Sequence, residues 1–206
     1  MVDVGEPLAG RPEAEAWLRS AGEAQLEADL AVLNGALFAH RMVTADPYLR
    51  PVSRGQALVA RVGFGAGELV AEGQWTAAHE LERKTPRRRR LKALQPQARL
   101  AAILSGREPP LVCEELALRA RSDVDQGRDR TAALQVLIVL DAALAELAGD
   151  GGLADRLEEL RARRDPIAAA AQSALAGPLN AEELEVVRST LGRIEAALRA
   201  RAAARA

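Results

Sequence analysis

The chain has very few aromatic residues, a single cysteine and almost no lysine. Phenylalanine, tryptophan and tyrosine together make up 2% of its 206 residues. Since aromatic and β-branched side chains favour strands, this composition excludes a large sheet core. Cys113 has no second cysteine to pair with, which excludes an intrachain disulfide and indicates a reducing compartment. Lys84 and Lys92 are the two lysines, so arginine supplies nearly all of the positive charge.

Long apolar runs and a targeting segment are also missing. The most apolar stretch, residues 132–140, is interrupted by Gln135 and followed by Asp141. It is far shorter than the ~20 residues that a membrane span needs. The first residues lack the basic and apolar regions of a secretory signal. We therefore expect a soluble, cytoplasmic protein with no membrane contact.

Two short motifs resemble ligand-binding motifs, but each lacks required residues at the required positions. The stretch GFGAG at 63–67 is followed by Glu68, where the dinucleotide fingerprint G-x-G-x-x-G requires glycine. The aspartates of DVDQGRD, at 123–129, resemble a calcium loop. Gly127 and Arg128 occupy its fifth and sixth positions, which require an oxygen ligand and glycine. A turn explains the first motif, and a helix end followed by a helix cap explains the second.

Histidine and cysteine are too dispersed to predict a metal site or a catalytic pair. His40, His79 and Cys113 have no ligand-pair spacing. Cys113 lies near an expected helix start, where a thiol pKa can fall, but Glu114 and Glu115 follow and oppose this. A buried structural cysteine is the simpler interpretation. We therefore predict no metal, no cofactor and no catalytic residue, although an enzyme whose site is dispersed in the sequence remains an alternative.

The residues that are abundant predict a mostly α protein. Hydrophobic residues make up 49% of the chain and are dominated by alanine, a strong helix former. We expect a bundle of about six helices with a small β-hairpin at 56–75. The predicted organisation is an acidic N-terminal helix plus hairpin at 1–82, a basic connector at 83–109 and a helical bundle at 110–206. The alternative organisation is one compact domain that combines the first and last parts.

The spacing of hydrophobic residues and the residues typical of helix ends predict the individual helices. The pattern predicts one helix from Glu13 to about Val43, and residues 132–140 mark the most buried helix of the chain. Asp165 before Pro166 is typical of a helix start, and Asn180 with Glu183 resembles a capping box. Further helices are expected at about 110–126, 129–148 and 153–164.

Residues 56–75 can be interpreted as two strands or as a helix. Leu58, Ala60, Val62 and Phe64 alternate, and so do apolar residues between 69 and 75. In a helix, each of the glycines at 63, 65 and 67 would cost ~1 kcal/mol relative to alanine. The pattern therefore favours a hairpin, with GAG at 65–67 as its turn.

An apolar stripe on the last helix has two interpretations. Core packing within one chain is the simpler, and pairing with a second copy, giving a homo-oligomer, is the alternative. The candidate self-association residues are Leu184, Val187, Leu191, Ile194 and Leu198.

One segment concentrates the positive charge. Residues 83–107 contain nine basic residues and no acidic one, which leaves 19 basic and 29 acidic residues elsewhere, a net charge of −10. Thr85-Pro86 is typical of a helix start, yet Arg87–Arg90 would then face the positive end of the helix dipole. Such a local conflict is typical of a functional or strained site. The candidate polyanion-binding or charge-pairing residues are Arg87, Arg88, Arg89, Arg90, Lys92 and Arg99.

Three explanations of this basic segment remain open. It can be a solvated loop, it can pair with acidic residues of the same protein at 1–39 or 68–82, or it can bind an external polyanion. Arginine suits bidentate phosphate contacts, although the scarce aromatic residues disfavour base stacking. We hypothesise a non-enzymatic binding or assembly module that uses this segment against an acidic protein or nucleic acid. The alternative is a self-associating structural or regulatory helical protein.

Overall fold

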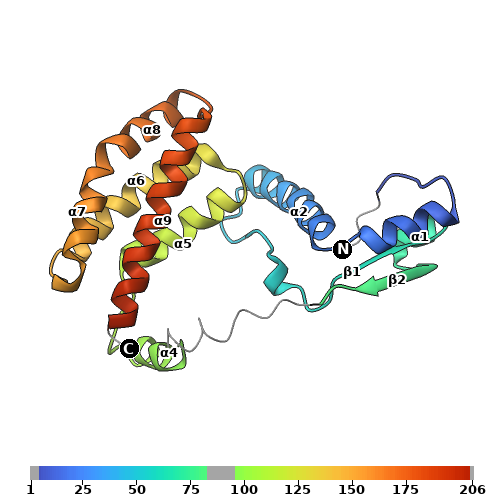
Figure 1. Ribbon diagram of the computed structural model, residues 1–206, viewed down its shortest axis with the longest axis horizontal. Coiled ribbons are helices and arrows are strands. Elements are labelled where there is room, and N and C mark those ends of the chain that lie inside the picture. The colour runs from blue at the N-terminus through green and yellow to red at the C-terminus, as the bar shows by residue number, and fades with distance from the viewer. Residues whose placement is uncertain (1–4, 83–95, 205–206) are drawn as a thin grey trace. The chain divides into compact units, whose positions relative to one another are not determined.

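The computed structural model describes residues 5–82 and 96–204, and it is mostly helical with one antiparallel hairpin, as predicted (Figure 1). The chain divides into an N-terminal unit, Met1–Thr85, and a C-terminal unit, Pro86–Ala206. None of the helices within the described ranges combines the length and the apolar character that a bilayer span requires.

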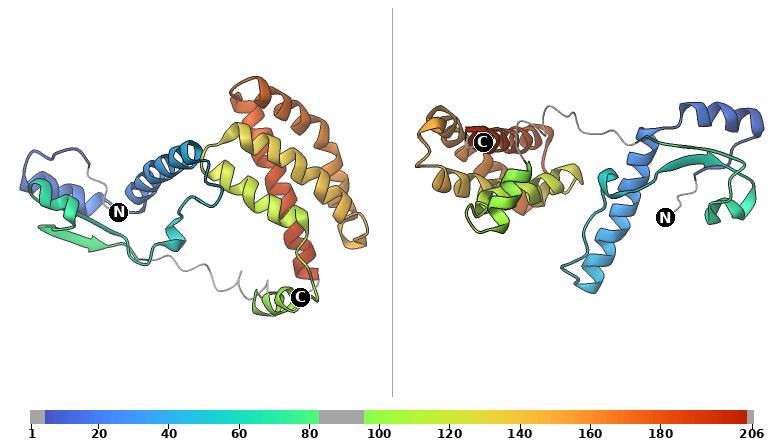
Figure 2. Two further views of the ribbon diagram at one scale, coloured as in Figure 1. Left: turned by 180° about the vertical axis from the view of Figure 1, so that it is seen from behind. Right: turned by 90° about the horizontal axis from the view of Figure 1, so that it is seen from below.

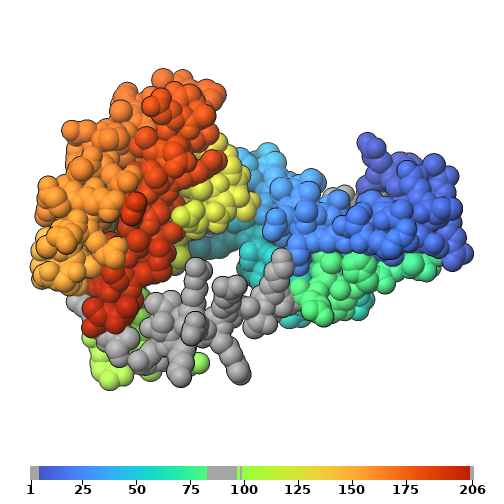
Figure 3. All heavy atoms as spheres, in the orientation of Figure 1, coloured from blue at the N-terminus to red at the C-terminus, as the bar shows by residue number. Residues whose placement is uncertain are grey.

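The C-terminal unit is a helical bundle built around its third helix. It consists of α4 (Pro96–Leu104), α5 (Val112–Asp125), α6 (Asp129–Glu146), α7 (Ala154–Ala162), α8 (Arg164–Ala176) and α9 (Ala181–Ala204). Helix α6 contacts α5, α8 and α9, and α9 in turn contacts α5, α7 and α8. Figure 3 shows α9, in red, packed closely along α7 and α8, in orange.

The hydrophobic core of the bundle follows from the sequence of α6. Val136, Val139 and Leu140 are fully buried, as are Leu191 and Ile194 of α9. Because apolar residues surround most of α6, it can pack against three neighbours at once. The prediction that residues 132–140 form the most buried helix is confirmed.

Most helices of the bundle begin or end close to where the neighbouring residues in the sequence predict. The Asn180 carboxamide oxygen accepts the Glu183 backbone N–H at 2.9 Å, and the Glu183 carboxylate accepts the Asn180 N–H at 2.8 Å. The predicted capping box is therefore present at the start of α9. Helix α8 begins at Arg164, one residue before the expected Asp165 cap. Gly127, with φ 65°, turns the chain between α5 and α6.

The N-terminal unit begins with two helices where the sequence predicted one. They are α1 (Arg11–Ser20) and α2 (Glu23–Thr44). The prediction of a continuous helix from 13 to 43 is wrong, because Ala21 is extended, with φ −67° and ψ 135°, and Gly22 follows it. Helix α1 packs on the hairpin strand β1 (Arg61–Phe64), as Figure 2 also shows.

The predicted hairpin is confirmed, but its second strand lies later in the sequence than the pattern indicated. Strand β1 pairs antiparallel with β2 (Ala77–Glu80), with Arg61 opposite Glu80 and Phe64 opposite Ala77. Residues 67–72 form a 3₁₀ helix instead of a strand, so the connection is longer than the expected GAG turn. Gly63 allows the strands to approach, since a Cβ there would lie 2.6 Å from the Ala78 Cβ.

Burial differs sharply between the two units. Among the described residues of the N-terminal unit, the buried apolar side chains are those of Ala14, Ala60 and Val62, and none is larger than valine. The bundle instead buries leucine and isoleucine from several helices. The stabilising core of the chain therefore lies in the C-terminal unit.

Candidate functional site

The structure shows one of the six predicted basic-site residues. Arg87, Arg88, Arg89, Arg90 and Lys92 lie outside the described residues. Arg99 lies on α4, in the part of the basic segment that the structure describes. The candidate site can therefore be built from Arg99 and from the end of the bundle that it contacts.

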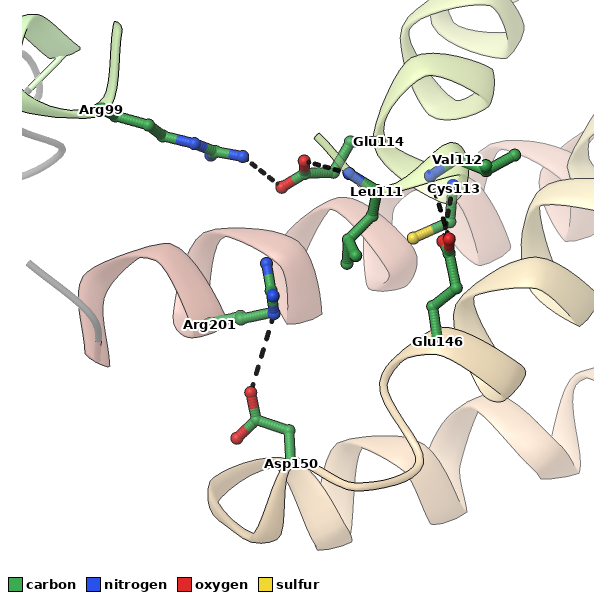
Figure 4. A network of polar contacts seen from close by, with 8 residues as sticks. All are labelled: Arg99, Leu111, Val112, Cys113, Glu114, Glu146, Asp150 and Arg201. Atoms are coloured by element: carbon green, nitrogen blue, oxygen red, sulfur yellow. Dashed lines mark hydrogen bonds and ion pairs between the residues drawn. The ribbon is translucent and has the colours of Figure 1, made fainter. Parts of the chain in front are cut away.

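Arg99 attaches α4 to the first turn of α5 (Figure 4). Its Nη2 donates to the Glu114 Oε1 at 2.5 Å, and the two side chains are 33% and 15% exposed. The Arg99 Nε is buried and has no hydrogen-bond partner. A charged hydrogen bond at partial burial is stronger than an exposed ion pair, so this contact links α4 to the start of α5.

The N-terminus of α5 is held by two carboxylates (Figure 4). Glu146, at the end of α6, accepts hydrogen bonds from the backbone N–H groups of Val112 at 3.1 Å and Cys113 at 2.8 Å. Glu114 accepts a third from the Leu111 N–H at 3.0 Å. Both acids thus satisfy free amides at the positive end of the helix dipole.

The environment of Glu146 favours its charged form. Burial by itself would raise its pKa, but hydrogen bonds from the backbone and thiol of Cys113 and from the Val112 amide outweigh this. The positive charge of Arg201 adds to them, so the net effect lowers the pKa. Glu146 therefore acts as an ionised cap and is not poised to transfer a proton near neutral pH.

Cys113 is the structural cysteine that the sequence favoured. It is fully buried, and its pKa is raised to about 12, first by burial and then by the Glu146 hydrogen bond and the charges of Glu146 and Glu114. A thiol of this kind is neutral at physiological pH and inaccessible to a substrate. The helix start does not activate it, because burial and then the neighbouring carboxylates raise the pKa of the thiol.

A cleft adjoins this network at the end of the bundle. It has a volume of about 430 Å³ and is lined by Glu146, Gly149, Asp150, Gly151, Arg201 and Ala204. The Arg201 Nε lies 3.8 Å from an Asp150 carboxylate oxygen, and Arg201 is 9% exposed. This pair ties the end of α9 to the loop after α6, so the charged groups of the cleft are already engaged within the chain.

A second cleft lies in the N-terminal unit, where α1 packs against the hairpin. Its volume is about 490 Å³, and its lining is Glu15, Leu18, Arg19, Phe64, Ala77 and His79. His79 and Glu15 are exposed, and Arg11 pairs with Glu15. Within the described ranges, no three histidine, cysteine or acidic side chains lie close enough together to hold a metal ion.

The predicted self-association stripe lies mostly inside the bundle. Val187, Leu191 and Ile194 are at most 1% exposed and belong to the chain's own core, and Leu184 and Leu198 are half-buried. A second copy could contact the three buried side chains only if α9 left this core. The observed packing corresponds to the simpler of the two interpretations, core packing within one chain.

Sequence reasoning missed two acidic residues that organise the bundle. Glu146 reaches amides 33 and 34 residues away in sequence. Asp123, 6% exposed, accepts from the Arg128 Nε at 2.6 Å and the Gln135 Nε2 at 2.7 Å. The DVDQGRD motif therefore closes the turn between α5 and α6. Gln135, a lone amide within an apolar run, was the available signal for this contact.

No protein-family model matches the sequence, and no curated protein or solved structure is significantly similar to it.

Proposed function

We propose that this chain is a non-enzymatic binding or assembly module whose basic segment, residues 83–107, binds an acidic partner. The partner is the backbone of a nucleic acid or an acidic protein surface. The single observation that carries the proposal is charge segregation: nine basic residues and no acidic one in a stretch of 25, in a chain otherwise charged −10. Such a segment attracts polyanions over long range.

At the end of the bundle that α4 joins, Arg99 of the basic segment already pairs within the chain, which leaves the other basic residues to be neutralised. The acidic residues of this end are already engaged: Glu114 by Arg99, Glu146 by two backbone amides and Asp150 by Arg201. These carboxylates are therefore poor candidates to neutralise further arginines. An external acid is the partner that we favour, with the acidic residues at 1–39 and 68–82 as the internal alternatives.

A second role, self-association through the α9 stripe, has less support. Its central side chains are buried in the core of the bundle, and exposing them would cost about as much as truncating them, roughly 2–5 kcal/mol for a large side chain.

Binding assays with two probes test the proposal. Fluorescence anisotropy of a labelled DNA duplex and of labelled polyglutamate, each at low salt, should show binding of at least one probe. Replacing Arg87–Arg90 with glutamine should then remove most of the affinity. Duplex binding indicates a nucleic-acid partner, and binding of polyglutamate alone indicates an acidic protein.

A matched variant controls for total charge. Replacing the exposed bundle residues Arg119, Arg156, Arg188 and Arg199 with glutamine removes the same charge elsewhere. This control should keep nearly full affinity. Equal losses in both variants, or no binding of either probe, would refute the proposal. Loss of the thermal transition in the Arg87–Arg90 variant would instead show that the run pairs within the protein.

A further inference from the structure

Arg201 is a buried arginine that makes no hydrogen bond to the described residues. It lies in the last turn of α9, and 9% of the residue is exposed. It forms an ion pair with Asp150, in which its Nε lies 3.8 Å from a carboxylate oxygen. That separation exceeds hydrogen-bond distance. Because a guanidinium has five N–H donors, the charge of Arg201 is balanced while its hydrogen-bonding capacity is unused.

A buried arginine of this kind calls for an acceptor. Most buried polar groups in folded proteins are hydrogen-bonded, and an unsatisfied charged donor costs stability. Arg201 lines the cleft at the end of the bundle, so a small molecule can reach its donors from there. The cleft, of about 430 Å³, is far larger than one water molecule requires and lies within the range of ligand-binding sites.

The other walls of the cleft supply a carboxylate and open space. Asp150 lies in the loop after α6, and its side chain points toward Arg201 (Figure 4). This side chain is 25% exposed, so its oxygens are also accessible to a ligand. Gly149, Gly151 and Ala204 line the rest of the cleft together with Glu146. One cation and one carboxylate thus lie side by side at the edge of an open space.

Glu146 already accepts hydrogen bonds within the chain. Its two oxygens accept the backbone N–H groups of Val112 and Cys113. These amides lie at the positive end of the α5 dipole, which offsets the charge of the carboxylate. A ligand in the cleft therefore binds mainly to the pair formed by Arg201 and Asp150.

We propose that this cleft binds a free α-amino acid, with its carboxylate on Arg201 and its ammonium group on Asp150. The protein pair is balanced in charge but not hydrogen-bonded, so it favours a ligand of zero net charge that carries both signs. The ligand carboxylate accepts two parallel hydrogen bonds from the guanidinium, the geometry that arginine provides for carboxylates. The ligand ammonium group donates to Asp150, which gives two ion pairs in opposite directions.

The walls of the cleft restrict which amino acids fit. Gly149, Gly151 and Ala204 leave room for a side chain but offer little apolar surface. A large apolar side chain gains affinity by burial against apolar surface, so it gains little in this cleft. We therefore expect glycine, serine and asparagine to bind better than leucine or phenylalanine. None of the residues that line the cleft belongs to 83–107, so the site is independent of the function proposed for the basic segment.

Thermal unfolding of the full chain tests the ligand class. Glycine, serine and asparagine in the millimolar range should raise the Tm by ~2 °C or more, since a ligand that binds only the folded state stabilises it. Acetate and methylammonium each carry one of the two charged groups. At equal concentration and ionic strength, each should give a much smaller shift than the amino acids. Shifts with acetate as large as those with glycine would show a simple anion site and contradict the proposal.

Equilibrium dialysis with the radiolabelled amino acid that gives the largest shift locates the site. Ala204→Leu enlarges a side chain on the wall of the cleft and should weaken binding by about tenfold or more. Ala203→Leu, at the neighbouring exposed position of α9, is the matched control and should keep full affinity. Equal affinities of the two variants would place the binding elsewhere and overturn the proposal.

Replacing Arg201 tests the guanidinium itself. Arg201→Gln should weaken binding by about tenfold or more, because the ligand carboxylate loses its charged hydrogen bonds. Arg199→Gln, on the same helix with its side chain 61% exposed, is the matched control. Circular dichroism checks that both variants fold, and Ala204→Leu, which keeps every charge, decides the matter if Arg201→Gln does not. Unchanged affinity in a folded Arg201→Gln variant, or no shift with any of the twenty amino acids, would overturn the proposal.

Discussion

At the scale of single residues, the bundle is organised by carboxylates that bind backbone amides. Glu146 and Glu114 together satisfy three N–H groups at the start of α5. This start has no serine, threonine, asparagine or aspartate in its capping position, which is Leu111. The acid of a distant helix therefore takes the role that a local cap usually has.

Replacing Glu146 should reveal this role. Glu146→Gln should lower the free energy of unfolding by about 0.5–2 kcal/mol at neutral pH, the usual cost of losing a helix cap. Chemical denaturation measures this change. Glu185→Gln, an exposed acid on α9, is the matched control and should change stability by less than about 0.5 kcal/mol.

The same side chain should make stability depend on pH. The folded-state pKa of Glu146 lies below the ordinary value of 4.5, so its ionised form stabilises the fold. This contribution is complete above that value and is lost as the pH falls through the lowered folded-state pKa. Wild type should therefore lose more stability than Glu146→Gln in acid denaturation. Parallel pH profiles for the two proteins would contradict the assignment.

Cys113 should react slowly in the native protein. Its pKa of about 12 and complete burial leave almost no accessible thiolate at pH 8. Alkylation by iodoacetamide should be more than about 100-fold slower than in denaturant, where the thiol regains its ordinary pKa. Comparable rates with and without denaturant would show that the start of α5 is open.

At the scale of elements, much of the fold could be predicted from local pattern. The apolar run Val136–Leu140 identifies α6, and Asn180 with Glu183 identifies the start of α9. Both signals lie within a few residues in sequence. The break at Ala21–Gly22 was missed because the surrounding residues continue a helical pattern.

The second strand and the Glu146 helix cap were not predicted, because both depend on tertiary contacts. Ala77–Glu80 contains no strongly strand-forming residue, and its pairing with Arg61–Phe64 makes it a strand. The Glu146 cap joins residues more than 30 positions apart, which a local pattern cannot show. The basic segment stands out in the sequence, and the site proposed there stays a prediction. The Glu114 partner of Arg99 could not be predicted, because it depends on how the two side chains meet across α4 and α5.

Helix α6 should be the element most sensitive to truncation. Leu140→Ala should lower the free energy of unfolding of the C-terminal unit by about 2–5 kcal/mol, since it leaves a cavity in the hydrophobic core. Ile138→Ala, on the exposed side of the same helix, should cost less than about 1 kcal/mol. Calorimetry of both variants measures the difference, and similar losses would contradict the central position of α6.

At the scale of the whole molecule, the basic segment and the hydrophobic core are separated along the sequence. The basic segment holds nine of the 28 basic residues, and the buried core belongs to the helices from α5 onward. The segment proposed to bind an acidic partner can therefore be changed without removing a side chain of that core.

The salt dependence of duplex binding tests the central claim most directly. The logarithm of the association constant should fall linearly with the logarithm of salt concentration, with a slope of about −0.9 for each phosphate contacted. Replacing Arg87–Arg90 with glutamine should make the slope shallower by about 3, as several contacts disappear. An identical slope in wild type and variant would contradict the claim that these arginines bind the partner.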